Sequence, residues 1–566
     1  MRYFYQNYPA LKRLTSFFLV LLFFSLNTSA QKLHLKIDGS SEKENRTIDS
    51  ISYPTVHPDL KSINTTINDF SEKLLKLGYI DNITEENKKT NDSLFSIRFS
   101  LGKKTENLYI YISKHTKQEL KGNITFKSDT VKIPFTEAEA FLNKTVNELE
   151  SKGFSLAKIK LINFKKTGNS LSAELKADIG SQRQVNDIVI NGYDKFPEGH
   201  KANIKRLYRN KTFNQENLKK INADFEKYRF VSQTKYPEIL FTKDTTKVYI
   251  YLEKSKPNKF EGFVGFSNDD EKNVKLNGYL DLLLVNTLNS GEEFSLYWKS
   301  DGNDQKTFNI ALELPYIFKT RFGLKASLNI FKQDSTFQNT KTAIDLGYYF
   351  NYNSRLYLGY QSSESSDIQN SNNASISDYT NSFITTNFEY TDFKTDDFLF
   401  PEKTRINIKT GYGSRISKLE TNKQIFLSID LKHNLYIDDK NSFNIKSQNY
   451  YLNSNNFIIN ELYRYGGINS IRGFSENSLQ ANIVTSILTE YRYLIAPGIY
   501  AHTITDYAYF EDKITQNKGN LLGIGIGFGI LTRNGLLNLI YANGSTNEQA
   551  IKLSNSIIHI SFKTTF

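Results

Sequence analysis

The sequence predicts three small α+β modules followed by an all-β transmembrane barrel of about sixteen antiparallel strands. Three observations lead to this prediction. The first 30 residues have the features of an export signal, a helix-and-strand pattern recurs up to residue 256, and only strand patterns follow from 257 to 566. Together they indicate an exported protein whose second half crosses a membrane as a closed barrel.

Residues 1–30 resemble a secretory signal peptide. Arg2, Lys12 and Arg13 supply positive charge, residues 14–26 form an apolar run, and residues 28–30 (Thr-Ser-Ala) offer a cleavage site. A transmembrane anchor is the alternative, but a spanning helix needs about 20 apolar residues, which is more than this run provides. We therefore expect export and removal of this segment.

The front half contains a repeated unit. Gly78 and Gly153 each follow a run with helical spacing and lie 75 residues apart, and a third such run follows. The helix positions are Ile63, Ile67, Phe70, Leu74 and Leu77; Ala138, Leu142, Thr145 and Leu149; and Leu218, Ile221, Phe225 and Tyr228. Two strand patterns follow each helix, at 94–100 and 107–112, 157–164 and 171–179, and 237–241 and 247–252. The predicted modules are 31–113, 114–182 and 183–256; another repeated α+β domain is the alternative.

Residues 257–566 show about sixteen alternating segments separated by turn residues, at the spacing of outer-membrane barrels. The predicted first strand is 259–269 and the last is 550–566. In the last strand Ile558, Ile560 and Phe562 alternate with polar residues, and the chain ends on Phe566. Phe562 and Phe566 therefore form the predicted C-terminal barrel signal.

The amino-acid composition and the motifs limit the classes of function expected for the protein. The chain has no cysteine, so neither disulfides nor thiolate chemistry is available, and its net charge of +12 is spread along the chain, as for contact with lipid headgroups. It contains neither a Gly-x-Ser-x-Gly nor a His-Glu-x-x-His motif. We expect no enzymatic activity, cofactor or metal, and no nucleic-acid partner.

Gly523, Gly525, Gly527 and Gly529 alternate within one predicted strand. A phosphate-binding loop would need a following helix, and no helical pattern follows. Glycine at every second position gives a strand one smooth face, which another chain segment can approach closely. We expect a loop folded into the barrel to lie there.

The most specific motif is Tyr465 to Phe474, Tyr-Gly-Gly-Ile-Asn-Ser-Ile-Arg-Gly-Phe. It resembles the (V/I)RG(F/Y) loop of the BamA/TamA superfamily, which folds into the barrel lumen between strands 11 and 12. The motif lies between the eleventh and twelfth predicted strands here. The front modules resemble POTRA domains, and three modules plus a barrel are most similar in plan to the TamA branch.

The resemblance implies a set of site residues. The loop motif is Gly466, Gly467, Ile471, Arg472, Gly473 and Phe474. Arg472 would pair with Glu490 on the next strand and Asp506 on the strand after, because a guanidinium fork can satisfy two carboxylates together. The family often has glycine two residues past this aspartate, where this chain has Ala508.

The resemblance also implies a location and a function. It implies the outer membrane of a two-membrane bacterium, with the modules in the periplasm. The expected function is an assembly factor that takes unfolded barrel proteins as clients, in contact with outer-membrane lipid and with a TamB-like periplasm-spanning partner. The alternatives are a two-partner-secretion transporter, which usually has two modules and a plug helix, a component of lipid transport, and a passive porin, which has no such modules.

Overall fold

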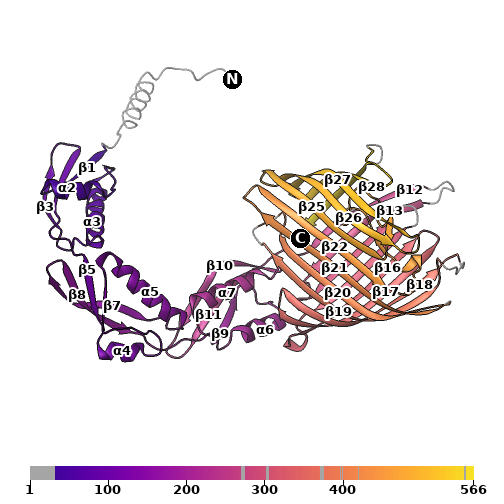
Figure 1. Ribbon diagram of the computed structural model, residues 1–566, viewed down its shortest axis with the longest axis horizontal. Helices are drawn as coiled ribbons and strands as arrows, with labels where there is room; N and C mark the ends of the chain where they lie inside the picture. The colour runs from indigo at the N-terminus through magenta and orange to yellow at the C-terminus, as the bar shows by residue number, and fades with distance from the viewer. Residues whose placement is uncertain are drawn as a thin grey trace, which may run out of the picture. The chain divides into compact units, whose positions relative to one another are not determined.

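The computed structural model describes residues 32–565 apart from 269–273, 301–304, 370–374, 395–396, 398, 419, 534 and 553–555 (Figure 1). The predicted signal peptide and Phe566 lie outside the described residues. The chain divides into two units, Met1–Arg183 and Gln184–Phe566. No described helix is long and apolar enough to cross a bilayer.

The first unit holds two α+β modules. In the first, α2 (Glu42–Asp49) and α3 (Leu60–Lys76) pack on a four-stranded sheet of order β2-β1-β4-β3, in which β1 and β4 run parallel. The strands are β1 Leu33–Gly39, β2 Val56–His57, β3 Ile83–Lys89 and β4 Leu94–Ser100. The predicted helix face lies in the core, where Ile63, Phe70 and Leu74 are buried.

The second module has a sheet of order β6-β5-β8-β7 with helices α4 (Lys114–Leu120) and α5 (Ala138–Ser151) and the 3-10 turn η1 (Phe135–Glu137). The strands are β5 Asn107–Tyr111, β6 Thr130–Pro134, β7 Lys158–Thr167 and β8 Ser170–Asp178. β5 pairs in parallel with β8, so the strand expected to close the first module belongs to this sheet. The boundary expected after residue 113 therefore falls between β5 and α4.

The glycine–aromatic pairs of the two modules have a common physical cause. Gly78 and Gly153 have φ of +100° and +95°, which side chains disfavour. The amide of the following residue then reaches back to the last helical turn, from Tyr79 to Leu74 O at 3.0 Å and from Phe154 to Leu149 O at 3.0 Å. This is the Schellman geometry that ends a helix and satisfies its free carbonyls.

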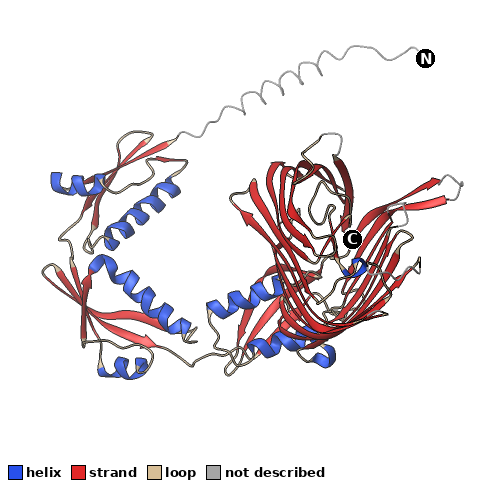
Figure 2. Cartoon of the chain, turned by 45° about the vertical axis from the view of Figure 1, so that its right-hand side comes forward, coloured by secondary structure: helices blue, strands red, loops and turns tan. Residues whose placement is uncertain are grey.

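The second unit begins with the third module, in which α6 and α7 pack on a sheet of order β10-β11-β9 (Figure 2). Its elements are β9 Asp187–Asn191, α6 Glu198–Tyr208, α7 Gln215–Glu226, β10 Val231–Phe241 and β11 Thr246–Lys254. Asn214 caps α7 by accepting from Asn217 N at 2.8 Å. The predicted helix positions Leu218, Ile221 and Phe225 are buried in its core.

This module packs against turns at the near end of the barrel. His200 of α6 is fully buried, and its ring lies 4.8 Å from that of Tyr316 and 5.6 Å from that of Tyr352, both in barrel turns. Tyr228 and Phe230 of the module complete the aromatic cage. Neither ring nitrogen of His200 has a hydrogen-bond partner among the described residues, and burial lowers its pKa from 6.5 to about 3.

We expect acidification to loosen this joint. The neutral imidazole is favoured when packed, whereas an undocked His200 has a pKa near 6.5, so stability is lost as the pH falls from about 6.5 towards 3. The loss between pH 7 and pH 5 is about 2 kcal/mol. Protease protection of α6 across this range measures it. His200→Phe should remove the pH dependence of protection. His115→Gln, at an exposed position, is the control and should leave that dependence unchanged. Parallel curves of protection against pH for wild type and His200→Phe would contradict the expectation.

The rest of the unit is a closed antiparallel barrel of sixteen strands, as predicted. The strands are β12 Lys259–Asn268, β13 Val274–Val285, β14 Glu293–Ser300, β15 Lys306–Leu314, β16 Phe322–Gln333, β17 Phe337–Asn351, β18 Ser354–Asp367, β19 Tyr379–Phe393, β20 Glu402–Ser417, β21 Thr421–Tyr436, β22 Asn441–Asn453, β25 Ile483–Ala496, β26 Ile499–Asp512, β27 Asn517–Thr532, β28 Gly535–Thr546 and β29 Ile557–Thr565. The last strand thus begins later than the predicted residue 550. Closure gives every barrel strand a hydrogen-bonded neighbour on each side. A lipid environment requires this, because it offers no water to backbone polar groups.

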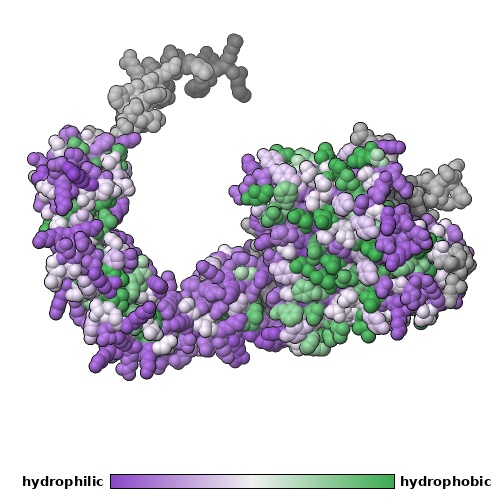
Figure 3. All heavy atoms as spheres, in the orientation of Figure 1, coloured by the Kyte–Doolittle hydropathy of each residue, from purple (hydrophilic) through white to green (hydrophobic). Residues whose placement is uncertain are grey.

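The outer face of the barrel is apolar. Outward side chains such as Ile344, Ile384 and Ile558 are exposed to between 62 and 68%. On the face shown in Figure 3, hydrophobic residues gather over the barrel strands, whereas the modules are mainly hydrophilic. This is the distribution expected of a barrel that faces lipid.

Candidate functional site

Residues 454–482 connect β22 to β25, the eleventh and twelfth barrel strands, and we call this segment the lumen loop. It contains the 3-10 turn η3 (Ile459–Glu461) and the short hairpin β23 (Tyr463–Tyr465) and β24 (Leu479–Ala481). The predicted motif follows β23. Its side chains contact the inner wall of the barrel, so the loop is folded inward.

Arg472 is held by both predicted carboxylates. Its Nε donates to Asp506 Oδ2 at 2.8 Å and its Nη2 to Asp506 Oδ1 at 2.5 Å, which is a bidentate fork. Its Nη1 donates to Glu490, and its backbone amide donates to Asp506 Oδ2 at 2.9 Å. The structure therefore brings together Arg472 of the loop, Glu490 of β25 and Asp506 of β26, and we call these three residues the arginine lock.

The arginine lock is withdrawn from water. Arg472 is 4% exposed and Asp506 is fully buried. Arg492 donates to Glu490 Oε2 from Nε at 2.8 Å and from Nη2 at 2.6 Å, and its guanidinium lies 3.9 Å from the centre of the Phe400 ring. Two guanidinium groups thus neutralise two carboxylates, which is the condition for burying such charges.

Sequence reasoning missed Arg492. The signal was available, because Arg492 lies two residues after Glu490 on one strand and alternate residues of a strand share a face. Arg492 also donates to Asn434 Oδ1 on β21 at 3.0 Å. It therefore ties the arginine lock to a more distant part of the wall.

The motif glycines are required by backbone geometry. Gly466, Gly467 and Gly473 have φ of +104°, +98° and +88°, which L side chains rarely adopt. A Cβ at Gly473 would also overlap the backbone of Asn543 on β28. The loop can therefore lie flat on the wall only with glycine at this position.

The apolar motif residues fill the space beneath the loop. Ile471 is 1% exposed and packs in a cluster with Ala508, Val484 and Leu521, with Phe474 at its margin. Ala508 stands where the resemblance leads one to expect glycine, and it is fully buried in this cluster. Phe562, the described residue of the predicted C-terminal signal, lies on β29 and is 39% exposed on the outer face.

The alternating glycines of β27 have different neighbours. A Cβ at Gly523 would overlap the carbonyl oxygen of Arg472, so the loop does lie against this position. At Gly527 and Gly529 the neighbours are instead the rings of His502 and Tyr500 on β26. A Cβ at Gly525 would meet the backbone of Tyr541 on β28. The expectation of a loop along the whole glycine face is therefore too broad, since Gly527 and Gly529 make room for large side chains of β26.

Gly523→Ala should displace the loop. The added methyl group meets the backbone of Arg472, which cannot turn away as a side chain could, and overpacking of this kind costs about 1–3 kcal/mol. The thermal midpoint of the folded barrel in detergent measures the loss. Gly519→Ala on the same strand meets the flexible end of the Asn547 side chain, makes an ordinary contact with the Phe510 ring, and should leave the midpoint unchanged. Equal midpoints for the two variants would contradict a loop contact at Gly523.

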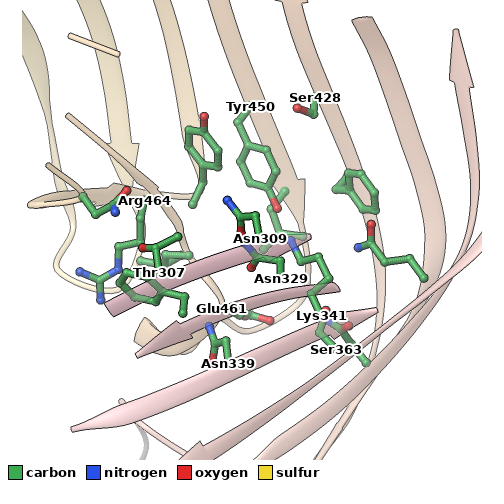
Figure 4. Close-up of a pocket in the computed structure, with 18 of the residues that line it drawn as sticks. Thr307, Asn309, Asn329, Asn339, Lys341, Ser363, Ser428, Tyr450, Glu461 and Arg464 are labelled. Carbon is green, nitrogen blue, oxygen red and sulfur yellow. Dashed lines mark hydrogen bonds between the residues drawn. The ribbon is translucent and has the colours of Figure 1, made fainter. Parts of the chain in front are cut away.

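A cavity of about 710 Å³ lies between the loop and the wall of the barrel. Figure 4 shows Asn309, Asn329 and Lys341 from the wall, with Glu461 and Arg464 from the loop. A second cavity of about 520 Å³ includes Arg472, Glu490 and the seam residues Lys259 and Lys563. In the described part of the chain, no group of acidic, histidine or cysteine residues is arranged to hold a metal ion.

The barrel closes where β12 meets β29, and we call this junction the seam. Its described register pairs are Lys259↔Thr565, Phe260↔Thr564 and Glu261↔Lys563. On its other side β12 pairs with β13 from Lys259 to Asn268, and β29 pairs with β28 from Ile557 to Lys563. The strands 262–268 and 557–562 are therefore paired on one side only among the described residues.

Comparisons with known proteins agree with this architecture. A family profile for the Omp85 superfamily domain matches residues 286–563. No curated protein matches the sequence. CdiB from Acinetobacter baumannii has a TM-score of 0.51 at 12% identity, covering 89% of this chain and 98% of its own. BamA from Haemophilus ducreyi lacking POTRA domains 1-3 has a TM-score of 0.46 at 15% identity, covering 81% of this chain and 98% of its own.

At these identities the solved structures support the fold alone, whereas the family match covers nearly the whole barrel. The structure itself shows the barrel, the inward-folded loop and the α+β modules, without use of the family match. Residues 286–563 therefore form an Omp85 superfamily domain, and the chain is a barrel protein of the bacterial outer membrane with POTRA-like modules in the periplasm.

Proposed function

We propose that this protein is an outer-membrane assembly factor that receives unfolded barrel proteins through its periplasmic modules and helps them insert at the seam. The observation that carries the proposal is the short pairing of β12 with β29. Three register pairs are described there, whereas β12 and β13 form ten. Among the described residues, the seam is thus the junction of the barrel with the fewest register pairs.

The seam strands offer a template for a client. An unpaired backbone amide or carbonyl costs several kcal/mol in lipid, so one-sided strands at 262–268 and 557–562 favour a partner strand. A client strand can supply the missing hydrogen bonds without disrupting the strands that are already paired. Gly262 on β12 supplies no side chain to the seam; a Cβ there would meet the backbone of Tyr279 on β13.

The modules can hold clients before insertion. Each sheet ends in edge strands, such as β3 in the first module and β7 in the second, which have a neighbour on one side only in the described sheets. An extended polypeptide can add to such an edge through backbone hydrogen bonds, independently of its sequence. The proposed clients are therefore unfolded outer-membrane proteins. The further proposed partners are outer-membrane lipid and a TamB-like protein. In this proposal the protein acts without enzymatic chemistry.

Folding kinetics in liposomes test the function. The purified protein is reconstituted, a urea-unfolded outer-membrane barrel is added, and its folding is followed by heat-modifiable gel mobility. We expect faster folding than in empty liposomes of the same composition. If folding is not accelerated where an established assembly factor accelerates it, the proposal fails. Release of an exported polypeptide, or lipid transfer between vesicles, would then identify secretion or lipid transport as the function.

A further inference from the structure

The lumen loop is also held at its other end, by a buried ion pair outside the sequence motif. Arg415 of β20 has a fully buried side chain, one of the largest such side chains in the described chain. Its Nη1 donates to Glu461 of the loop, and its Nη2 donates to Glu420 Oε1 at 2.7 Å. The polarity is the reverse of the arginine lock, since here the wall supplies the arginine and the loop supplies the carboxylate.

The carboxylate of Glu461 has several donors. Gln424 Nε2 of β21 donates to Oε2 at 2.7 Å, and the backbone amide of Ile458 donates to Oε1 at 3.1 Å. The Glu461 side chain is 2% exposed. This carboxylate therefore fixes the turn η3 and binds it to two wall strands at once, because hydrogen bonds to a charged, desolvated group are stronger than neutral ones.

The neighbouring Asn460 extends the contact to three more strands. It is 1% exposed, and its Nδ2 donates to Ser365 Oγ of β18 at 2.7 Å. Its carbonyl oxygen accepts from Asn339 Nδ2 of β17 at 2.6 Å and from Tyr379 OH of β19 at 3.3 Å. Residues 460–461 are therefore bound to strands β17 to β21, on a different part of the wall from β25 and β26, which hold Arg472.

The loop between these two attachments separates the two lumen cavities. Asn469 lines both the cavity of about 710 Å³ and the cavity of about 520 Å³. The segment from Glu461 to Arg472 therefore crosses the lumen as a strut, fixed by a buried charged group at each end. The two ends have different partners in the wall, so we expect displacement of one end to leave the other in place.

We propose that Arg415 and Glu461 form a second anchor of the lumen loop, and that the lumen opens fully only when this anchor and the arginine lock are both released. Arg415 is a positioning residue that acts through Glu461. The inference rests on the geometry of the loop and does not require the protein to be an insertase.

Cysteine labelling separates the two ends of the loop, because the native chain contains no cysteine. The reporters are Leu462→Cys, next to the second anchor, and Ile471→Cys, next to the arginine lock; both positions are buried. In reconstituted protein, Glu461→Gln and Arg415→Met should each raise maleimide labelling at position 462 by about tenfold and leave position 471 unchanged. Arg472→Ala should do the opposite.

Two further measurements sharpen the test. Combining Arg415→Met with Glu461→Gln should add little to either alone, because one interaction is lost in each case. Single-channel conductance should rise most when Glu461→Gln is combined with Arg472→Ala. Arg355→Met is the matched control, since Arg355 is a lumen arginine that pairs with Glu313 and Glu389 of the wall and not with the loop.

Folding is checked in every variant by heat-modifiable mobility. Glu461 lies in the loop rather than in a barrel strand, and glutamine keeps its shape, so Glu461→Gln remains informative if Arg415→Met does not fold. Unchanged labelling at position 462 in a folded Glu461→Gln protein would overturn the second anchor. Equal labelling increases at both positions would overturn the independence of the two ends.

Discussion

Arg472→Ala should abolish the acceleration of client folding while the barrel itself remains closed. The substitution leaves Asp506 fully buried without its bidentate partner, and it leaves Glu490 with Arg492 alone. Removing one member of a buried ion pair costs about 3–5 kcal/mol, because the remaining charge is not compensated. Displacing the loop is the least costly way to let water reach Asp506. The barrel should stay closed because its sixteen strands pair with one another and the loop strands β23 and β24 form a separate sheet.

Lysine at position 472 should restore part of the activity. It keeps the positive charge but has no planar fork, so it can satisfy one oxygen of Asp506 and not the pair that Arg472 now contacts. Arg533→Ala, in the exposed turn between β27 and β28, controls for loss of an arginine. The measurement is client folding rate in liposomes together with heat-modifiable mobility of the variant. Full activity of a folded Arg472→Ala protein would show that the arginine lock is dispensable.

The arginine lock could be predicted because its parts are marked in the sequence by a local motif and by acids on the next two strands. The second anchor could not. Arg415 and Glu461 are 46 residues apart and meet across the lumen, and neither belongs to a recognisable pattern. The structure identifies Arg415 and Glu461 as partners because Arg415 is fully buried and a buried arginine needs a hydrogen-bond acceptor. Contacts of this kind form only when the barrel closes. Hydrophobic alternation predicts a closed barrel, but it does not specify which side chains face each other across the lumen.

In the modules, too, sequence patterns identify elements without specifying which elements pair with each other. Helices were found from their apolar faces: α5 contains all the predicted positions, and α3 contains all but Leu77, which is its C-cap. β5 was placed in the wrong module because its parallel partner β8 begins about 60 residues later, and strand spacing does not reveal which sheet a strand joins. The seam was expected between the first and last strands, but its short register could not be derived from either strand alone, because register depends on both.

Crosslinking the seam should stop client insertion altogether. Glu261 and Lys563 are register partners whose side chains line the same lumen cavity. Antiparallel partners have Cα atoms about 4.5–5.5 Å apart, which a disulfide can bridge. In Glu261→Cys/Lys563→Cys protein, oxidation should reduce client folding to the rate in empty liposomes, and reductant should restore it. The native chain has no cysteine, so the bridge has no competing thiol.

The control crosslink joins the same last strand to its other neighbour. Asn538 and Ser561 are register partners of β28 and β29, and both line that cavity. An Asn538→Cys/Ser561→Cys disulfide fixes strands that already pair from Ile557 to Lys563, so it should leave activity unchanged in either redox state. If both oxidised proteins are fully active, clients do not enter through the seam, and the short β12–β29 pairing is a feature of closure alone. Selective loss in the seam variant means that the three-pair junction has to open for each client.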